Sequence, residues 1–182
     1  MNVCDSYLTL TLNFGRVALE PVSISHEEDI FRNFTPGVAK YTYPQPANDI
    51  SVISSFVVEA RKRMMRKSEF QAVILNGTTN EFLGCAGLHH MNEKEHLPAL
   101  GIWLKENVWG QGYGTEAITA LKYFGKGVLR EASYFRWPVA TENTPSIKLA
   151  RKMGGIQEGE PFLVSNANGD ELEEVLFLIP NK

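Results

Sequence analysis

The hydrophobic positions of this chain follow two spacings, one typical of strands and one typical of helices. Short apolar or alternating runs bounded by turn residues predict strands, and apolar positions three and four residues apart predict helices that bury one face. The expected strands are residues 8–12, 17–22, 70–75, 82–91, 98–104, 134–140, 159–164 and 172–179. Helices lie between them and no linker or repeat interrupts the series, so we expect one α+β domain over residues 1–182.

Two of the expected helices have recognisable ends. Asn48-Asp49 precedes an amphipathic segment that finishes in the basic run 61–67, which we interpret as a solvated face whose cations complement the helix dipole. Thr144 followed by Pro145 predicts the N-cap and first turn of a later helix, and Gly154 predicts its end.

Composition excludes several classes of function. Of the 182 residues, 43% are hydrophobic and 21% are charged, which is typical of a globular domain. The net charge of −3 argues against a broad surface for nucleic acid or an anionic membrane. Cys4 and Cys85 lack the spacing of zinc ligands, so we expect no metal and no disulfide. The N-terminus does not resemble a signal peptide and no apolar run approaches about 20 residues, so we expect a cytoplasmic protein without a membrane anchor.

Three glycines in five residues separate an apolar strand from the longest helical pattern: Gly110, Gly112 and Gly114. Glycine takes positive φ without steric cost and lets a ligand lie on the backbone. The first amides of a helix have no intrahelical acceptor and carry partial positive charge, so the loop is a candidate diphosphate cradle. The alternative is a tight turn that needs glycine only for its shape. The loop has neither the Gly-Lys-Ser/Thr of a P-loop nor the spacing of a dinucleotide motif.

The residues around this loop resemble the acetyl-CoA signature of the GNAT N-acetyltransferase superfamily, and more narrowly its Rim-like branch, which acetylates ribosomal-protein N-termini. The resemblance rests on Gly-Ile-Trp-Leu at 101–104 and Trp-Gly-Gln-Gly-Tyr-Gly-Thr-Glu-Ala at 109–117. In the family pattern Gln/Arg-x-x-Gly-x-Gly/Ala, Trp109 stands first and Gly112 and Gly114 fill the glycine positions. The resemblance implies a mixed, mostly antiparallel sheet with a splayed strand pair, flanked by helices.

The resemblance also implies where acetyl-CoA binds. Its pantetheine arm would lie between strands 101–104 and 134–140, with the diphosphate on the amides of 110–115. Ser146 is implied as proton donor to the CoA thiolate and Asn143 as a positioning residue, although serine is also common in a first helical turn. The implied cofactor-binding residues are Ile102, Trp103, Leu104, Trp109, Gly110, Gln111, Gly112, Tyr113, Gly114, Thr115, Asn143 and Ser146.

The proton acceptor is not evident from this resemblance. Family members often carry a glutamate where this chain has Ala99, so a different base is needed. His89 and His90 lie on the neighbouring expected strand, where side chains alternate, so one of them faces the cleft and the other faces away. We rank His90 and His89 ahead of Glu93 and His96. The alternative is that each histidine is simply packed.

Residues 40–46 contain two prolines, which exclude a regular helix. In Rim-like enzymes the corresponding region borders the acceptor site, so Tyr41 and Tyr43 are candidate substrate-binding residues, the alternative being plain packing.

The resemblance implies an N-acetyltransferase that moves an acetyl group from acetyl-CoA to a primary amine by direct attack in a ternary complex. The acceptor would be a protein N-terminus or a small-molecule amine. Two other classes stay open: a CoA-binding sensor or interaction domain without transferase activity, and an α+β domain whose glycines only form a turn. The C-terminal hairpin would allow a homodimer.

Overall fold

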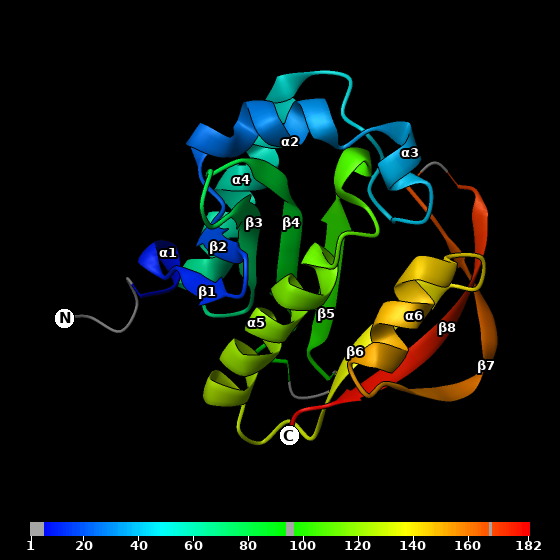
Figure 1. Ribbon diagram of the computed structural model, residues 1–182. Coiled ribbons are helices and arrows are strands. Elements are labelled where there is room, and N and C mark those ends of the chain that lie inside the picture. The colour runs from blue at the N-terminus through cyan, green and yellow to red at the C-terminus, as the bar shows by residue number, and fades with distance from the viewer. Residues whose placement is uncertain (1–5, 94–96, 168) are drawn as a thin grey trace.

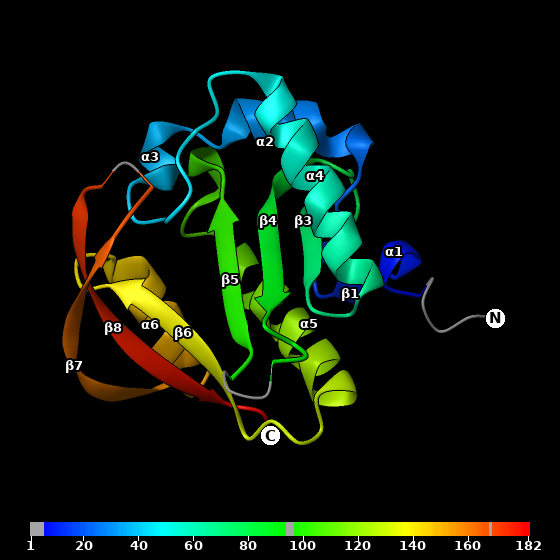
Figure 2. The ribbon, with the colours of Figure 1, turned by 180° about the vertical axis from the view of Figure 1, so that it is seen from behind.

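A computed structural model describes residues 6–93, 97–167 and 169–182, which form one sheet with helices on both of its faces (Figures 1 and 2). The strand order across the sheet is β1-β2-β3-β4-β5-β6-β8-β7. The strands are β1 (Leu12–Phe14), β2 (Val17–Pro21), β3 (Phe70–Asn76), β4 (Phe82–His89), β5 (Ala99–Leu104), β6 (Tyr134–Ala140), β7 (Ile156–Ser165) and β8 (Glu171–Pro180). The helices are α1 (Ser6–Thr9), α2 (Glu27–Asn33), α3 (Pro36–Ala39), α4 (Ile50–Met65), α5 (Tyr113–Val128) and α6 (Thr144–Lys152). The expected α+β class is confirmed.

The sheet separates two faces with different helices. In Figure 1, α5 and α6 lie in front of the strands, and in the reverse view of Figure 2, α4 lies in front. A Cβ on Gly114 of α5 would lie 3.5 Å from Leu104 and 3.9 Å from Ile102, so the even-numbered residues of β5 face α5. Side chains alternate along a strand, so the odd-numbered residues of β5 face α4. We call these the α5 face and the α4 face.

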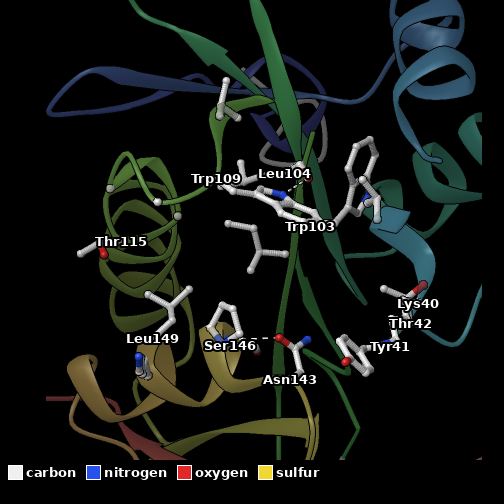
Figure 3. A pocket seen from close by; sticks show the side chains of 18 of the residues that line it. Lys40, Tyr41, Thr42, Trp103, Leu104, Trp109, Thr115, Asn143, Ser146 and Leu149 are labelled. Carbon is white, nitrogen blue, oxygen red and sulfur yellow. Dashed lines mark hydrogen bonds between the residues drawn. The ribbon is translucent and has the colours of Figure 1, made fainter. Parts of the chain in front are cut away.

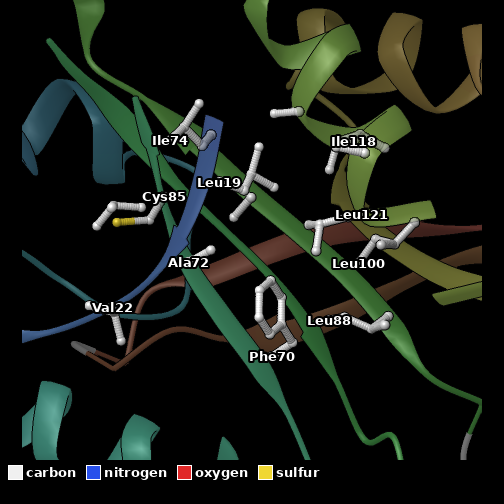
Figure 4. Close-up of a cluster of buried hydrophobic side chains, with 14 of the residues drawn as sticks. Leu19, Val22, Phe70, Ala72, Ile74, Cys85, Leu88, Leu100, Ile118 and Leu121 are labelled. Carbon is white, nitrogen blue, oxygen red and sulfur yellow. The ribbon is translucent and has the colours of Figure 1, made fainter. Parts of the chain in front are cut away.

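The main core lies on the α5 face. Leu19, Phe70, Leu88 and Leu121 are fully buried and gather between α5 and the strands (Figure 4). The rings of Phe70 and Phe124 are in tilted contact with centroids 4.7 Å apart, in the range of favourable aromatic pairs. This packing anchors α5, and therefore the glycine loop before it, to the centre of the sheet.

Strands β5 and β6 splay apart. They are the only parallel neighbours among the described strands, and their ladder contains a single pair, Ala99 with Arg136. Arg136 N donates to Pro98 O at 2.8 Å at this closed end. Beyond that point the two edges of β5 and β6 that face each other have no strand partner in the described chain. This is the arrangement of a splayed strand pair.

Two local expectations were wrong. Residues 8–12 were expected to form a strand, but α1 occupies Ser6–Thr9 and β1 begins only at Leu12. Tyr7 of α1 is buried edge-on against aromatic rings of the core, and this tertiary contact outweighs a short alternating pattern. Thr144 was expected to cap α6, but the cap is Asn143, whose Oδ1 accepts a hydrogen bond from Ser146 N at 3.2 Å. Both residue types cap well, and the loop places Asn143 in the capping position.

Candidate active site

Two cavities meet at the open end of the splay. One has a volume of about 720 Å³, lies on the α5 face and is lined by the glycine loop and the start of α6 (Figure 3). The other, of about 520 Å³, is lined by α4-face residues of the sheet, by α4 and by the loop after α3. We call them the loop cavity and the trough. The residues that line both are Tyr41, Thr42, Ile102, Trp103, Asn143 and Ser146.

The glycine loop offers a row of free backbone amides. Gly110 has φ +74° and Gly112, the N-cap of α5, has φ +90°, conformations that favour glycine. The amides of residues 110–114 donate no hydrogen bond within the described residues, whereas Thr115 N donates to Gly112 O at 3.0 Å. Five consecutive free donors at a helix N-terminus suit an anion with several oxygens.

Arg16, from the turn between β1 and β2, holds this loop from behind. Its Nη2 donates to Gln111 O at 2.8 Å and its Nε donates to Glu116 Oε1 at 2.8 Å. The guanidinium carbon also lies 4.5 Å from the ring centroid of Tyr113. Burial raises the pKa of the Glu116 carboxyl, but the hydrogen bonds from Arg16 outweigh burial, and the pKa falls below its ordinary value. Sequence patterns did not point to Arg16, which is far from the loop along the chain.

Ten of the twelve expected cofactor-binding residues line the loop cavity. Gln111 and Tyr113 do not. The side chain of Gln111 donates to Asn107 O at 3.0 Å, and that of Tyr113 lies beside Arg16. Both therefore support the loop from outside the cavity. Trp109 Nε1 donates to Leu104 O at 2.7 Å, which ties the loop to the end of β5 (Figure 3).

The charges lining the loop cavity are all positive. Lys40, Lys148 and Lys152 line it, and no aspartate or glutamate of the described chain does. Lys148 and Lys152 are four residues apart on α6, so they share one face of that helix. This lining favours a polyanionic ligand.

The open edge of β5 presents main-chain groups to the splay. Lys105 N donates to Leu83 on β4, so by alternation the main-chain groups of the odd-numbered residues, including Trp103, point toward β4. The N–H of Ile102 then points into the splay, where β6 provides no partner. The amide of Ile102, and not that of Trp103, is therefore placed to stabilise an oxyanion in the splay.

Ser146 lies where the two cavities meet, on the first turn of α6. Its Oγ accepts a hydrogen bond from Trp137 Nε1 at 3.0 Å, and its amide donates to the Asn143 side chain. Trp137 is only 3% exposed, on β6, and also lines the trough. No sequence pattern distinguishes Trp137, since a tryptophan on an apolar strand usually indicates packing.

The geometry separates the two histidines. His89 is the last residue of β4, pairs with Ala99 on β5 and lines the trough. A Cβ on Gly87 would lie 2.6 Å from His89 Nε2, and one on Gly101 would lie 3.4 Å from it, so the imidazole lies over these two glycines. His89 Nδ1 is 3.6 Å from Glu69 Oε2.

Glu69 is held in turn by Arg63, whose Nε donates to Glu69 Oε2 at 2.8 Å. Burial raises the pKa of the Glu69 carboxyl, but its interactions with His89 and Arg63 outweigh burial, and the net pKa is below the ordinary value. Glu69 is therefore charged at neutral pH and lies beside His89 Nδ1, while His89 Nε2 lies on the side of Gly87 and Gly101 in the trough.

His90 has φ +57°, pairs with Glu93 at 2.7 Å and lines neither cavity. His96, the other expected alternative, lies outside the described residues.

The two expected substrate-binding tyrosines both line the trough, and Tyr41 also lines the loop cavity. Tyr43 O accepts a hydrogen bond from Ala167 N of the β7–β8 turn at 3.2 Å. The C-terminal hairpin thus holds the loop that borders both cavities.

Several other features have no place in the site chemistry. Cys85 is a free, buried thiol whose pKa is raised far above its usual range by burial, and Cys4 lies outside the described residues. Among the described residues, no group of three or more histidine, cysteine, aspartate or glutamate side chains is arranged to hold a metal ion. No described helix has the length and apolar character needed to cross a bilayer.

Comparison with known proteins identifies the family. Residues 16–156 match the family model of the GNAT acetyltransferase domain. The chain is 25% identical over 168 residues to an N-acetyltransferase called p20 from Bacillus licheniformis, covering 92% of this chain and 94% of that protein.

Two solved structures share the fold. The ribosomal L7/L12 alpha-N-protein acetyltransferase RimL, in complex with coenzyme A, has a TM-score of 0.79 at 18% identity, covering 93% of this chain and 97% of that one. The microcin C7 self-immunity acetyltransferase MccE, in complex with acetyl-CoA and AMP, has a TM-score of 0.81 at 20% identity, covering 97% and 99%. With the domain match, these likenesses show that the chain belongs to the GNAT acetyltransferase family and is an acyltransferase.

Proposed function

We propose that the protein transfers an acetyl group from acetyl-CoA to a primary amine in a ternary complex. One observation carries this proposal: a cavity lined by free loop amides and lysines opens, through the strand splay, into a second cavity that contains a histidine. The first suits a polyanionic cofactor, the second suits an acceptor, and their shared residues mark the place of reaction.

The loop cavity fits acetyl-CoA. The amides of residues 110–114 would hold its diphosphate, and Lys148 and Lys152 would add positive charge. The open edge of β5 would pair with the amides of the pantetheine arm, since buried main-chain groups need partners. When bound, acetyl-CoA supplies an acetyl thioester, the activated group for amide formation.

The residues at the splay suit the proton transfers and charge changes of this reaction. His89 Nε2 would accept the proton of the incoming ammonium, with Glu69 orienting the ring through Nδ1. The N–H of Ile102 would stabilise the negative charge that develops on the carbonyl oxygen. Ser146 would donate its hydroxyl proton to the leaving thiolate as the C–S bond breaks, and would regain a proton from the nitrogen that becomes the amide. His89 thus replaces the carboxylate that family members often carry where this chain has Ala99.

Ala99 also favours a second candidate, a CoA-binding sensor without transferase activity. The two functions differ in one measurable respect, the transfer of the acetyl group to an amine. Calorimetry with CoA tests the cavity, and release of free CoA from acetyl-CoA in the presence of a panel of amines tests the transfer. We expect both binding and release. Binding with no transfer to any amine would favour the sensor, and the absence of any heat with CoA would contradict both.

We further propose a cytoplasmic location and a homodimer. The dimer would use β7, the outermost strand at one edge of the sheet, where Ile156 is 69% and Leu163 66% exposed. Light scattering at increasing concentration tests the dimer, and Leu163→Lys should leave a monomer.

A further inference from the structure

The trough differs from the loop cavity in the charge of its lining. Glu174 of β8 is the only aspartate, glutamate, lysine or arginine of the described chain that lines it. Burial raises the pKa of the Glu174 carboxyl, and the nearby Arg136 cation offsets this only in part. A partly buried carboxylate attracts a cation and repels an anion, so the trough favours an acceptor with a positive charge and no negative one.

The walls of the trough are mostly apolar and aromatic. Phe34, Phe56, Trp103 and Trp137 are among the lining residues, and the rings of Phe34 and Trp103 are in tilted contact with centroids 5.0 Å apart. Binding is favourable when an apolar or aromatic part of a ligand is buried against such walls. A polyamine carries several positive charges, but the trough would offer only one carboxylate to pair with them. Its chain would also leave these walls uncovered.

The buried end of the trough contains an unpartnered polar group. Gln71 of β3 is only 8% exposed, lines the trough, and its side-chain amide has no hydrogen-bond partner among the described residues. A Cβ on Gly87 would lie 2.5 Å from Gln71 Oε1, so the amide lies over β4. A ligand that fills the trough removes water from this amide, so a ligand that offers a hydrogen bond in return is favoured. Because the amide both donates and accepts, either orientation suits a ligand hydroxyl.

Between Gln71 and the splay, two glycines leave room on the floor of the trough for the Gln71 amide and the His89 imidazole, which lie over them. Gly87 pairs with Gln71 on one side and with Gly101 on the other, so the three form one row across β3, β4 and β5. Neighbouring strands are about 4.8 Å apart, so the main chain of Gln71 is roughly 10 Å from β5, and its side-chain amide, which lies over Gly87 of β4, is nearer. A ligand with its amine in the splay would reach Gln71 with a polar group at its far end.

We propose, on the basis of the proposed acetyl transfer, that the acceptor is a compact arylalkylamine: one amine, an aromatic body, no acidic group, and a hydroxyl at the far end that bonds Gln71. Glu174 draws the ammonium toward the splay and excludes carboxylated analogues. Gln71 selects the hydroxyl. The two residues thus determine specificity from opposite ends of the trough.

The test uses the purified full-length protein, acetyl-CoA and five amines, with free CoA measured as thiol and products identified by mass. The amines are tyramine, 2-phenylethylamine, tyrosine, spermidine and a tetrapeptide with a free N-terminus. We expect tyramine to exceed 2-phenylethylamine in kcat/KM by about two- to tenfold, the range of one hydrogen bond. It should exceed tyrosine by at least about tenfold because of charge repulsion.

Variants assign these differences to residues. Gln71→Leu keeps the volume but removes the amide, and should abolish the preference for tyramine over 2-phenylethylamine. Glu174→Gln should reduce the discrimination against tyrosine. Glu173→Gln is the matched control, since Glu173 precedes Glu174 on β8, lines neither cavity and accepts a hydrogen bond from Thr141. Thermal unfolding and CoA affinity establish that each variant is folded.

The outcomes separate this inference from the function on which it rests. If spermidine or the peptide is acetylated faster than the arylalkylamines, or if neither variant changes selectivity, the acceptor assignment is overturned while acetyl transfer stands. If CoA binds but no amine is acetylated, the transferase proposal itself fails, and this inference fails with it.

Discussion

The indole N–H of Trp137 donates a hydrogen bond to the hydroxyl oxygen of Ser146 at 3.0 Å. An indole nitrogen can only donate, so the proton of the Ser146 hydroxyl must point elsewhere. Ser146 lines both cavities, whereas Trp137 is buried in β6 behind it. The pair therefore directs the serine proton toward the splay, where the proposed leaving thiolate would form.

Replacing Trp137 should impair chemistry more than cofactor binding. We expect Trp137→Phe to lower kcat about tenfold and to leave the KM for acetyl-CoA unchanged, because the glycine loop is not altered. Ser146→Ala should lower kcat by about 10- to 100-fold, at the low end for a general acid because a free thiol has a pKa near 8.5. Steady-state kinetics of both single variants and the double variant test the coupling. Additive losses would show that the two residues act independently.

A side chain at Gly112 should weaken cofactor binding. Gly112 has φ +90°, and an added Cβ would lie 3.2 Å from Arg16 Nη2, so Gly112→Ala should disturb the free amides. We expect CoA affinity by calorimetry to fall at least tenfold. Gly159→Ala is the control for backbone strain, since Gly159 has φ +71° and no neighbour within 4 Å of an added Cβ. It should lose about 1–2 kcal/mol of stability with unchanged affinity. Equal affinities in both variants would contradict a role for the loop in binding.

The ion pair behind the loop should make stability depend on pH. The folded pKa of Glu116 is below its unfolded value, so its contribution to stability is present above the unfolded pKa of about 4.5 and disappears as pH falls through the folded pKa. Glu116→Gln should therefore lower Tm at pH 7, by about 2–4 °C for each kcal/mol lost, and converge with the parent in acid. Calorimetric scans across this range measure the difference.

An exposed ion pair provides the control for this prediction. Glu28 and Arg32 are 3.0 Å apart and both mostly exposed, so Glu28→Gln should change Tm little at any pH. If Glu116→Gln lowers Tm equally at neutral and acid pH, the effect comes from packing and not from the charge.

The two histidines should behave differently in a pH–rate profile. We expect His89→Gln to lower kcat/KM about 100-fold and to remove the acid limb, because the proton acceptor is lost. Glu69→Gln should lower the rate less, since it only orients the ring. His90→Gln should retain both the rate and the limb, because its side chain lines neither cavity. A retained acid limb in His89→Gln would remove His89 from the mechanism.

The basic run 61–67 shows the limit of a local interpretation. We interpreted it as a solvated helix end, and Lys62 does pair with exposed Glu59 on the same helix. Arg63, however, holds Glu69, which contacts His89 at the trough. A charge pattern predicts that a cation lies at a helix end, but its partner depends on what the chain brings near that end.

The sequence by itself determined the class of fold and predicted the glycine loop that we propose as the cofactor half of the site. Strand β5, the glycine loop and the start of α5 are contiguous in the chain, so residue types and spacing are enough to predict a run of free amides after a strand. Positive φ at Gly110 and Gly112 and the helix that follows are local consequences of that order.

Only the tertiary structure decided the acceptor half. Gln71, Trp137 and Glu174 come from three separate strands, and none has a local pattern that distinguishes it from surface or core. The choice between His89 and His90 depended on where β4 ends, because His89 is its last residue and His90, with φ +57°, has left the strand. Which side chains share a cavity is set by pairing across the sheet, and pairing depends on contacts between residues far apart in the chain.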